Sequence, residues 1–322
     1  MNGAACGKVI LIGEHAAVYG VPALAAGIDR GVRAHATPAA QTRLRVPAWG
    51  FEVTLDASAR DDEEPLARAM RTLVAATGGG PWDVEAEVEL PPGGGLGCSA
   101  ALGVAVARAI DPGVSAAELL RRADAWERVF HGSPSGVDAA VAASGGCVVF
   151  EKGKGVRPVH VGRPLVLVVG STGIASSTKS MVDGVARLRE RRKAVVDKSF
   201  EAIRTLSSNA TLAVEAGDVA ALGQLLDLCQ MLLGGLLVST PEIEQMCASA
   251  RKAGAYGAKL TGGGGGGSVI ALVEDDALAQ RVLSAWSDDG YFGFVTRVER
   301  ESMAAAVRRE MAHASAQTEP AP

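Results

Sequence analysis

A glycine-rich segment between two stretches of regular structure restricts the fold of this chain more than any other feature. Residues 82–90 (WDVEAEVEL) alternate apolar and acidic side chains, which predicts a half-exposed strand. PPGGGLGCSA follows, and residues 100–110 are then rich in Ala and Val, which predicts a helix. Glycines let the backbone approach a ligand closely, and a helix N-terminus attracts anions. This order predicts a polyphosphate site, although a flexible turn before a capped helix explains the segment alone equally well.

The composition favours a two-lobed protein that binds small ligands. A chain of 322 residues is long enough for two ordinary domains, each with its own core. Apolar residues make up 48% of the chain and aromatic residues only 4%, so the core must consist largely of Ala, Val and Leu. The formal charge of -4 supplies no basic field for a polyanion, and a nucleic acid partner is therefore not expected.

The sequence also predicts a cytoplasmic protein without a membrane segment. Glu14 and His15 directly follow the first apolar run, which has neither the basic region nor the cleavage site of a signal peptide. The apolar run at residues 225–238 contains Asp227 and Gln230 and is shorter than the roughly 20 residues that cross a bilayer. The oligomeric state stays open, a homodimer included.

The five cysteines do not indicate a disulfide framework or a zinc site. They are odd in number, scattered, and never arranged as C-x-x-C. We therefore expect reduced and mostly buried thiols at Cys6, Cys98, Cys147, Cys229 and Cys247.

The order of the expected elements indicates an α+β fold with two lobes. We place the boundary near residue 163, which gives domains at residues 1–163 and 164–313 and a disordered tail at residues 314–322. The expected strands are residues 8–12, 82–90, 145–150, 165–169, 268–273 and 292–298, and the expected helices are residues 100–110, 115–130, 183–216, 218–233, 240–254 and 275–286.

Three motifs in order give the chain its resemblance to a known family. No P-loop sequence is present, and residues 262–267 match a dinucleotide fingerprint only because all six are glycine. PPGGGLGCSA instead resembles the nucleotide-phosphate motif of the GHMP kinases, while GKVILIGEHAAVYG (residues 7–20) and KLTGGGGGGS (residues 259–268) resemble their first and third motifs. The resemblance implies an N-terminal nucleotide-binding lobe and a C-terminal ferredoxin-like lobe. It also implies that ATP is bound by Pro92, Gly93, Gly94, Gly95, Leu96, Gly97, Cys98, Ser99 and Ala100.

The resemblance also assigns the groups for phosphoryl transfer. ERVFHGSPSGVDAA (residues 127–140) carries two carboxylates, of which Asp138 matches the catalytic base. Glu127 and Ser99 match the Mg²⁺ ligands, although an arbitrary glutamate is more often a solvated helix residue. Lys8 begins a buried strand, where an unpaired ammonium is costly, and the match implies that it pairs with Asp138. The alternative is a lysine that extends to solvent from a strand end.

The acceptor side resembles that of the mevalonate kinases within the GHMP kinases. Their first motif matches GKVILIGEHAAVYG almost residue for residue, and STGIASSTKSMV (residues 171–182) resembles their segment facing the substrate carboxylate. This implies transfer from ATP to the primary hydroxyl of mevalonate. The alternatives are another GHMP kinase, such as a phosphomevalonate, sugar or homoserine kinase, or a non-catalytic sensor with this fold. The implied substrate-binding residues are Glu14, His15, Ser135, Ser177, Thr178, Gly263 and Gly264, although Ser177 and Thr178 could instead cap a helix.

Three positions depart from the usual family pattern. Cys98 stands where a serine is usual, and Ala139 stands where Asn or Thr often follows the base. The third motif is an uninterrupted glycine run, which we expect to wrap the phosphates or close the acceptor site. None of these departures removes a proposed catalytic group.

Overall fold

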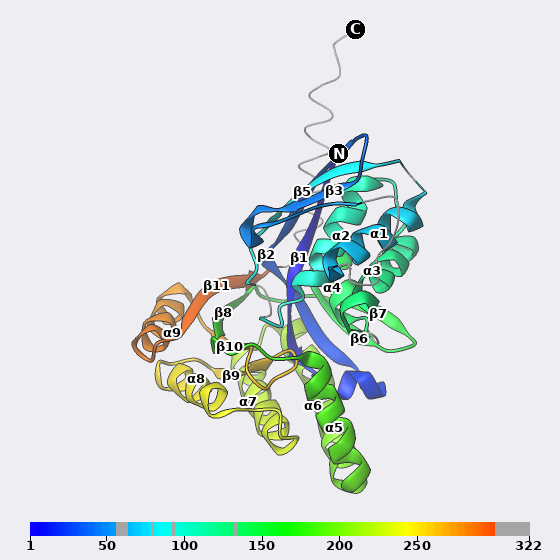
Figure 1. Cartoon of the computed structure of the whole chain (residues 1–322). Helices are drawn as coiled ribbons and strands as arrows, with labels where there is room; N and C mark the ends of the chain where they lie inside the picture. The colour runs from blue at the N-terminus through cyan, green and yellow to red at the C-terminus, as the bar shows by residue number, and fades with distance from the viewer. Residues whose placement is uncertain (56–63, 79, 92–93, 132–133, 300–322) are drawn as a thin grey trace.

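The computed structural model describes residues 1–55, 64–78, 80–91, 94–131 and 134–299, which form two lobes built on separate sheets (Figure 1). The change from one sheet to the other falls between Val159 and Leu165. The expected tail at residues 314–322 lies outside the described residues.

The first lobe contains a seven-stranded sheet. Its path runs β4-β3-β5-β2-β6-β7, with β1 paired to β2 beside it. All pairings are antiparallel except that of β3 with β5. The strands are β1 (Asn2–Ile12), β2 (Ala23–Pro38), β3 (Arg43–Val46), β4 (Phe51–Thr54), β5 (Trp82–Val88), β6 (Cys147–Glu151) and β7 (Gly155–Val159), with short 3-10 helices η1 (Ala16–Tyr19) and η2 (Pro47–Trp49).

Small residues let the helices of this lobe pack close to its sheet. A Cβ on Gly3 of β1 would lie 2.1 Å from the carbonyl oxygen of Ala105 in α2, so strand and helix backbones almost touch. A Cβ on Gly103 would come within 2.7 Å of the fully buried Trp126 ring, which therefore needs glycine at this position. The helices are α1 (Pro65–Thr77), α2 (Cys98–Ile110), α3 (Ala116–His131) and α4 (Val137–Ser144).

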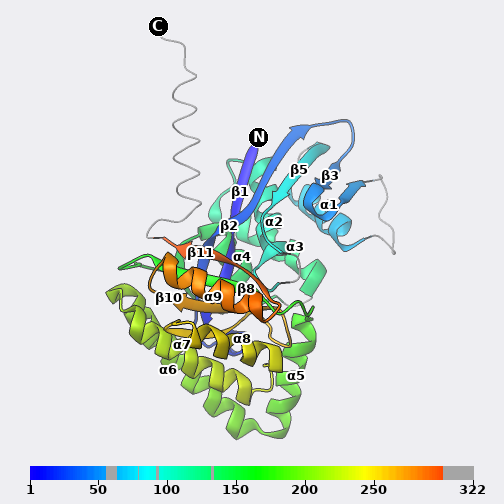
Figure 2. The ribbon, with the colours of Figure 1, turned by 90° about the vertical axis from the view of Figure 1, so that its left-hand side faces the viewer.

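The second lobe has the ferredoxin-like arrangement that the resemblance implied. Its four strands are all antiparallel and run in the order β11-β8-β10-β9. Helices α7 and α8 lie on the side of this sheet away from the first lobe (Figure 2). The elements are β8 (Leu165–Ser171), α5 (Thr178–Arg191), α6 (Lys193–Ala216), α7 (Val219–Gly235), α8 (Pro241–Lys252), β9 (Gly257–Thr261), β10 (Ser268–Val273), α9 (Asp276–Asp288) and β11 (Phe292–Val298).

The expected strands and helices are present, with one helix broken in two. Ser115 and Thr240 begin their helices as N-caps, because each side chain accepts a hydrogen bond from the N–H three residues later. The prediction of one helix over residues 183–216 is wrong, since Arg192 leaves helical geometry at φ −136° and ψ 46°. Asp197 then contacts Arg189 of α5 across the break and Lys193 within α6. Charge pairing of this kind gives no periodicity signal in the sequence.

Hydrogen bonds join the two lobes beside the glycine-rich loops. The Ile10 N–H donates to Thr261 Oγ1 at 2.8 Å, and the Ser268 hydroxyl donates to the Gly94 carbonyl at 2.6 Å. The first and third motifs, far apart in sequence, therefore meet at one place. Within the described ranges, no helix is both long and apolar enough to cross a bilayer.

Candidate active site

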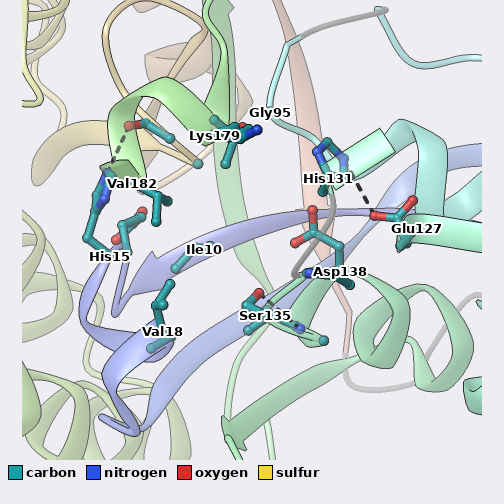
Figure 3. Close-up of a pocket in the computed structure, with 18 of the residues that line it drawn as sticks. Ile10, His15, Val18, Gly95, Glu127, His131, Ser135, Asp138, Lys179 and Val182 are labelled. Carbon is teal, nitrogen blue, oxygen red and sulfur yellow. Dashed lines mark hydrogen bonds and ion pairs between the residues drawn. The ribbon is translucent and has the colours of Figure 1, made fainter. Parts of the chain in front are cut away.

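A cavity of about 450 Å³ lies between the lobes. Residues of β1, the loop after it, both glycine-rich loops and helices α3, α4 and α5 form its wall. Figure 3 shows Asp138 between Ser135 and Glu127, with His15 and Val182 toward the other side. Residues from all three matched motifs therefore face one space.

Lys8 and Asp138 form an ion pair at this cavity. Lys8 Nζ lies 3.1 Å from Asp138 Oδ1 and donates to the Gly95 carbonyl at 2.9 Å. The Lys8 side chain is 3% exposed and that of Asp138 is 33% exposed, so the lysine is held inside while the carboxylate stays accessible. Gly97 is required beside them, because a Cβ there would lie 2.9 Å from Lys8 Cγ and its φ is +70°. The predicted pairing of Lys8 is thus present.

Ser99 and Glu127 form a second polar pair, of which Glu127 lines the cavity. The Ser99 hydroxyl donates to Glu127 Oε1 at 2.6 Å, and His131 Nε2 lies 3.7 Å from Glu127 Oε2. Burial, with a contribution from the Asp138 carboxylate, raises the pKa of Glu127 to about 7, although the Ser99 hydrogen bond opposes this shift. Glu127 is therefore a buried carboxyl that a nearby cation would stabilise as the anion.

These two residues fit a magnesium ion bound together with phosphate. A hydroxyl and a carboxylate are hard oxygen ligands, and Mg²⁺ is usually held by one or two carboxylates plus substrate phosphates. In the described parts of the chain, no group of three His, Cys, Asp or Glu side chains is placed to hold a metal. The remaining ligands of an ion at this site would therefore come from phosphate and water.

The predicted phosphate loop, residues 94–97 of the glycine-rich segment, ends at the N-terminus of α2. Gly95 and Gly97 have φ of +72° and +70°, and the Gly97 carbonyl begins the helix by accepting from the Ala101 N–H. The first N–H groups of a helix have no partner within it, so they point at the site where an anion would bind. Of the predicted nucleotide residues, Pro92 and Gly93 lie outside the described residues. Gly94, Gly95, Leu96 and Gly97 form the turn, and Cys98, Ser99 and Ala100 are the first residues of α2.

Glu14 and His15 line the cavity, and each has one buried side-chain atom to which no described group donates a hydrogen bond. Burial and the Lys259 charge lower the pKa of His15, so the imidazole is neutral at pH 7. His15 Nε2 donates to the Gly263 carbonyl at 2.8 Å, which makes Nδ1 an acceptor, and Nδ1 has no partner within the described structure. Glu14 Oε2 is also buried without one. Both atoms could accept a hydrogen bond from a ligand hydroxyl.

Of the two hydroxyl residues predicted to bind substrate at the start of α5, only one lines the cavity. Thr178 lines the cavity together with Lys179, whereas Ser177 is outside its wall and caps α5 by accepting from the Ser180 N–H at 3.3 Å. Lys179 was not singled out in the sequence, although it follows directly after Ser177 and Thr178. It is exposed and makes no ion pair with any described residue.

The third motif touches the cavity through its first glycines. Gly262 and Gly263 line the wall, whereas Gly264 lies behind it and its carbonyl accepts from the Ser176 hydroxyl. A Cβ on Gly264 would lie 2.2 Å from the Val238 carbonyl oxygen, and its φ is +73°. Glycine is therefore needed where the run packs against the preceding loop. Ser135, also predicted, lines the cavity as well.

Cys98 is half-buried next to the cavity and has no sign of reactivity. Burial, reinforced by the Glu127 charge, raises the pKa of its thiol to about 12, and all five cysteines are free thiols, four of them buried. A helix N-terminus can lower a thiol pKa, but burial dominates here. Cys98 therefore stays protonated at neutral pH and is a poor nucleophile.

We expect Cys98→Ser to keep activity within a few-fold, because backbone N–H groups can hold phosphate whatever side chain stands at this position. Ser99→Ala on the neighbouring residue should lower activity far more, since it removes the hydroxyl beside Glu127. Steady-state kinetics of the two variants at several Mg²⁺ concentrations measure this difference. An inactive Cys98→Ser beside an active Ser99→Ala would reverse both assignments.

The fold and this site together are those of a two-lobed small-molecule kinase: a helix start with unpartnered N–H groups, an accessible carboxylate paired to a lysine, and a cavity between the lobes. The family models agree with this class. The model of the GHMP kinase N-terminal domain matches residues 65–146, and that of the GHMP kinase C-terminal domain matches residues 210–291. The chain belongs to the GHMP kinases.

Several mevalonate kinases are similar to this chain over most of its length. The mevalonate kinase of Methanothermobacter thermautotrophicus is 35% identical over 82% of this chain and 87% of its own length. The mevalonate kinase of Pyrococcus horikoshii is 32% identical over 92% of this chain and 95% of its own length. The crystal structure of L. major mevalonate kinase with R-mevalonate superposes with a TM-score of 0.81 at 26% identity, covering 94% of this chain and 97% of the other.

Proposed function

We propose that this protein transfers the γ-phosphoryl group of ATP to the primary hydroxyl of mevalonate. The observation that carries the proposal is the placement of two sets of groups around one cavity. The Lys8–Asp138 pair lies beside the phosphate loop, and Lys179 with the unpartnered acceptors Glu14 and His15 lines the same space. Mevalonate carries a hydroxyl for transfer, a second hydroxyl and a carboxylate. The names of the relatives support this substrate.

Asp138 is the proposed base. Its Oδ1 is held by Lys8, which leaves the other carboxylate oxygen to accept the proton of the acceptor hydroxyl. The Lys8 ammonium, fixed by the Gly95 carbonyl, keeps the base oriented and stabilises negative charge on the attacking oxygen. Phosphoryl transfer needs little covalent chemistry from the protein, so positioning of this kind accounts for most of what its residues do.

Ser99 and Glu127 are the proposed magnesium ligands, and the phosphate loop is the proposed site of the ATP phosphates. When bound, Mg²⁺ would neutralise charge on the phosphates. The first lobe would thus hold the nucleotide. The proposed domain boundary near residue 163 falls between β7 and β8, which belong to different sheets.

Lys179 is the proposed partner of the mevalonate carboxylate. It is a cation on the cavity wall without an ion-pair partner among the described residues, and an ammonium there would neutralise a bound carboxylate. Apolar side chains of Ile10, Val18 and Val182 line the same cavity and would contact the methyl-bearing carbon chain. This combination of one cation and an apolar wall suits a small branched hydroxy acid.

An acceptor screen tests the proposal. With ATP and Mg²⁺, mevalonate should be preferred over phosphomevalonate, galactose and homoserine by at least about tenfold in kcat/KM, about 1.4 kcal/mol of transition-state preference. Lys179→Gln should raise the KM for mevalonate more than the KM for ATP, and Lys179→Arg should restore part of the loss. A better rate with any of the other three acceptors, or no turnover with all four, would refute the assignment.

A further inference from the structure

A buried ion pair joins the second lobe to the acceptor end of the cavity. Lys259 lies in the middle of β9, and its ammonium contacts Glu14 Oε1 in the loop after β1. Both side chains are 0% exposed. The pair therefore crosses the lobe interface in a fully desolvated environment, next to the glycines of the third motif.

The lysine side chain is fixed by more than its contact with Glu14. Lys259 Nζ also donates to the Leu260 carbonyl at 2.5 Å and lies 3.5 Å from the Ile10 carbonyl. An ammonium has three donors, and these three oxygens account for all of them. The Lys259 ammonium is therefore held by oxygens of both lobes: Glu14 and Ile10 in the first and Leu260 in the second.

The geometry of Glu14 leaves half of its carboxylate free. Lys259 holds Oε1, whereas Oε2 is buried without a partner, as is Nδ1 of the adjacent His15. Leaving a buried acceptor without a donor costs roughly 1–3 kcal/mol. Both residues line the cavity, so a hydroxyl of the acceptor molecule could donate to one of these two atoms when it binds.

Without its lysine, Glu14 would not keep this form. Burial raises the pKa of the Glu14 carboxyl, and the charge and hydrogen bond of Lys259 are the largest influences that oppose the shift, ahead of a backbone hydrogen bond and the Lys8 charge. A protonated Glu14 would be a hydrogen-bond donor on one oxygen and would rotate to find an acceptor. The anion, by contrast, offers a fixed acceptor to the cavity.

We propose that Lys259 is a positioning residue of the acceptor pocket, which keeps Glu14 anionic with its free oxygen aimed at a second hydroxyl of the acceptor. The inference rests on the proposed function, in that Glu14 contacts the phosphate acceptor. It narrows the acceptor class to molecules that carry a hydrogen-bond donor besides the hydroxyl that is phosphorylated. It also makes the pocket complete only when the second lobe supplies Lys259.

A purely structural role is the competing explanation. Buried ion pairs are weak evidence for stability, because desolvation often cancels their attraction and well-packed apolar residues can replace them. A lysine retained only for lobe packing would affect the binding of both substrates alike. A positioning residue would affect the acceptor and act through Glu14.

The experiment compares Lys259→Met, Glu14→Gln and the double variant. We expect Lys259→Met to raise the KM for mevalonate at least about tenfold while the KM for ATP stays within twofold, because only the acceptor contacts Glu14. Adding Glu14→Gln to Lys259→Met should change the mevalonate KM by less than about twofold, since coupled residues are not additive. Lys259→Arg should recover part of the acceptor affinity.

Thr296→Val is the matched control, because Thr296 is also fully buried and its hydroxyl donates across the lobe interface, to Asp29, away from the cavity. It should lower the melting temperature and leave both KM values unchanged. Lys259→Met could fail to fold because it leaves the Glu14 charge buried alone. In that case the KM for mevalonate of the double variant, which buries no charge here, is compared with that of Glu14→Gln. Equal mevalonate KM values support the proposal.

Two results would overturn the inference: independent, multiplying effects of the two substitutions, or equal changes in the KM for mevalonate and for ATP. A failure of the proposed function would appear elsewhere, in the unmodified protein, which would then not phosphorylate mevalonate. In that case the same variants would be measured with the acceptor that the screen identifies.

Discussion

Replacing Asp138 by Asn lowers kcat by about a hundredfold or more, the usual scale for the loss of a general base. The amide keeps the shape of the side chain and can still accept a hydrogen bond from Lys8, but it cannot take the proton of the acceptor hydroxyl. Nucleotide binding should persist, because the phosphate loop and the start of α2 are unchanged. Steady-state kinetics with mevalonate and calorimetric titration with ATP separate the two effects.

Asp197→Asn is the control for this substitution. Asp197 also pairs with a lysine and an arginine, but it lies at the α5–α6 break and does not line the cavity. It should leave kcat within about twofold, as expected for a surface ion pair. If Asp138→Asn retains most of its turnover, Asp138 is not the base, and the Lys8–Asp138 pair would instead position other groups.

Glu127→Gln is expected to weaken the dependence on Mg²⁺ rather than the proton transfer. The Mg²⁺ concentration for half-maximal activity should rise by about tenfold or more, the loss typical of a changed group at a metal site. Excess Mg²⁺ should restore much of the rate, because Ser99 and the phosphates still supply oxygen ligands. Activity measured over a range of Mg²⁺ concentrations at fixed ATP checks this.

Glu118→Gln provides the comparison on the same helix. Glu118 pairs with Arg121 and Arg122 near the beginning of α3 and lies outside the cavity wall. Its Mg²⁺ response should match that of the unmodified protein. Identical Mg²⁺ curves for Glu127→Gln and Glu118→Gln would contradict the assignment of Glu127 as a ligand.

The sequence predicted the parts of the site that local motifs specify. The nucleotide loop was placed on a strand, turn and helix because glycine and alanine patterns are local signals. The pairing of Lys8 with Asp138, 130 positions apart, came from the family motifs and from the high cost of a buried lysine, not from spacing. The ferredoxin-like lobe was likewise implied by resemblance, and the observed strand order agrees with it.

The features that the sequence did not predict depend on which side chains face each other after folding. In the sequence Lys259 is only the first residue of the third motif, and it is the docking of β9 on the first lobe that brings it to Glu14. Ser177 and Lys179 are two positions apart at the start of α5, yet one caps the helix and the other lines the cavity. Side-chain direction at a helix start is set by the cap geometry, which residue identity alone does not fix.

The two glycine-rich loops touch each other, and this contact has a consequence for how such an enzyme can change. The groups proposed for proton transfer and metal binding, Lys8, Ser99, Glu127 and Asp138, are all supplied by the first lobe. The cavity wall, by contrast, is shared: the second lobe contributes α5 residues, Lys179 among them, and the first glycines of the third motif. Substitutions around α5 can therefore alter the proposed acceptor pocket while the groups proposed for phosphoryl transfer stay intact, so the same scaffold can serve different acceptors.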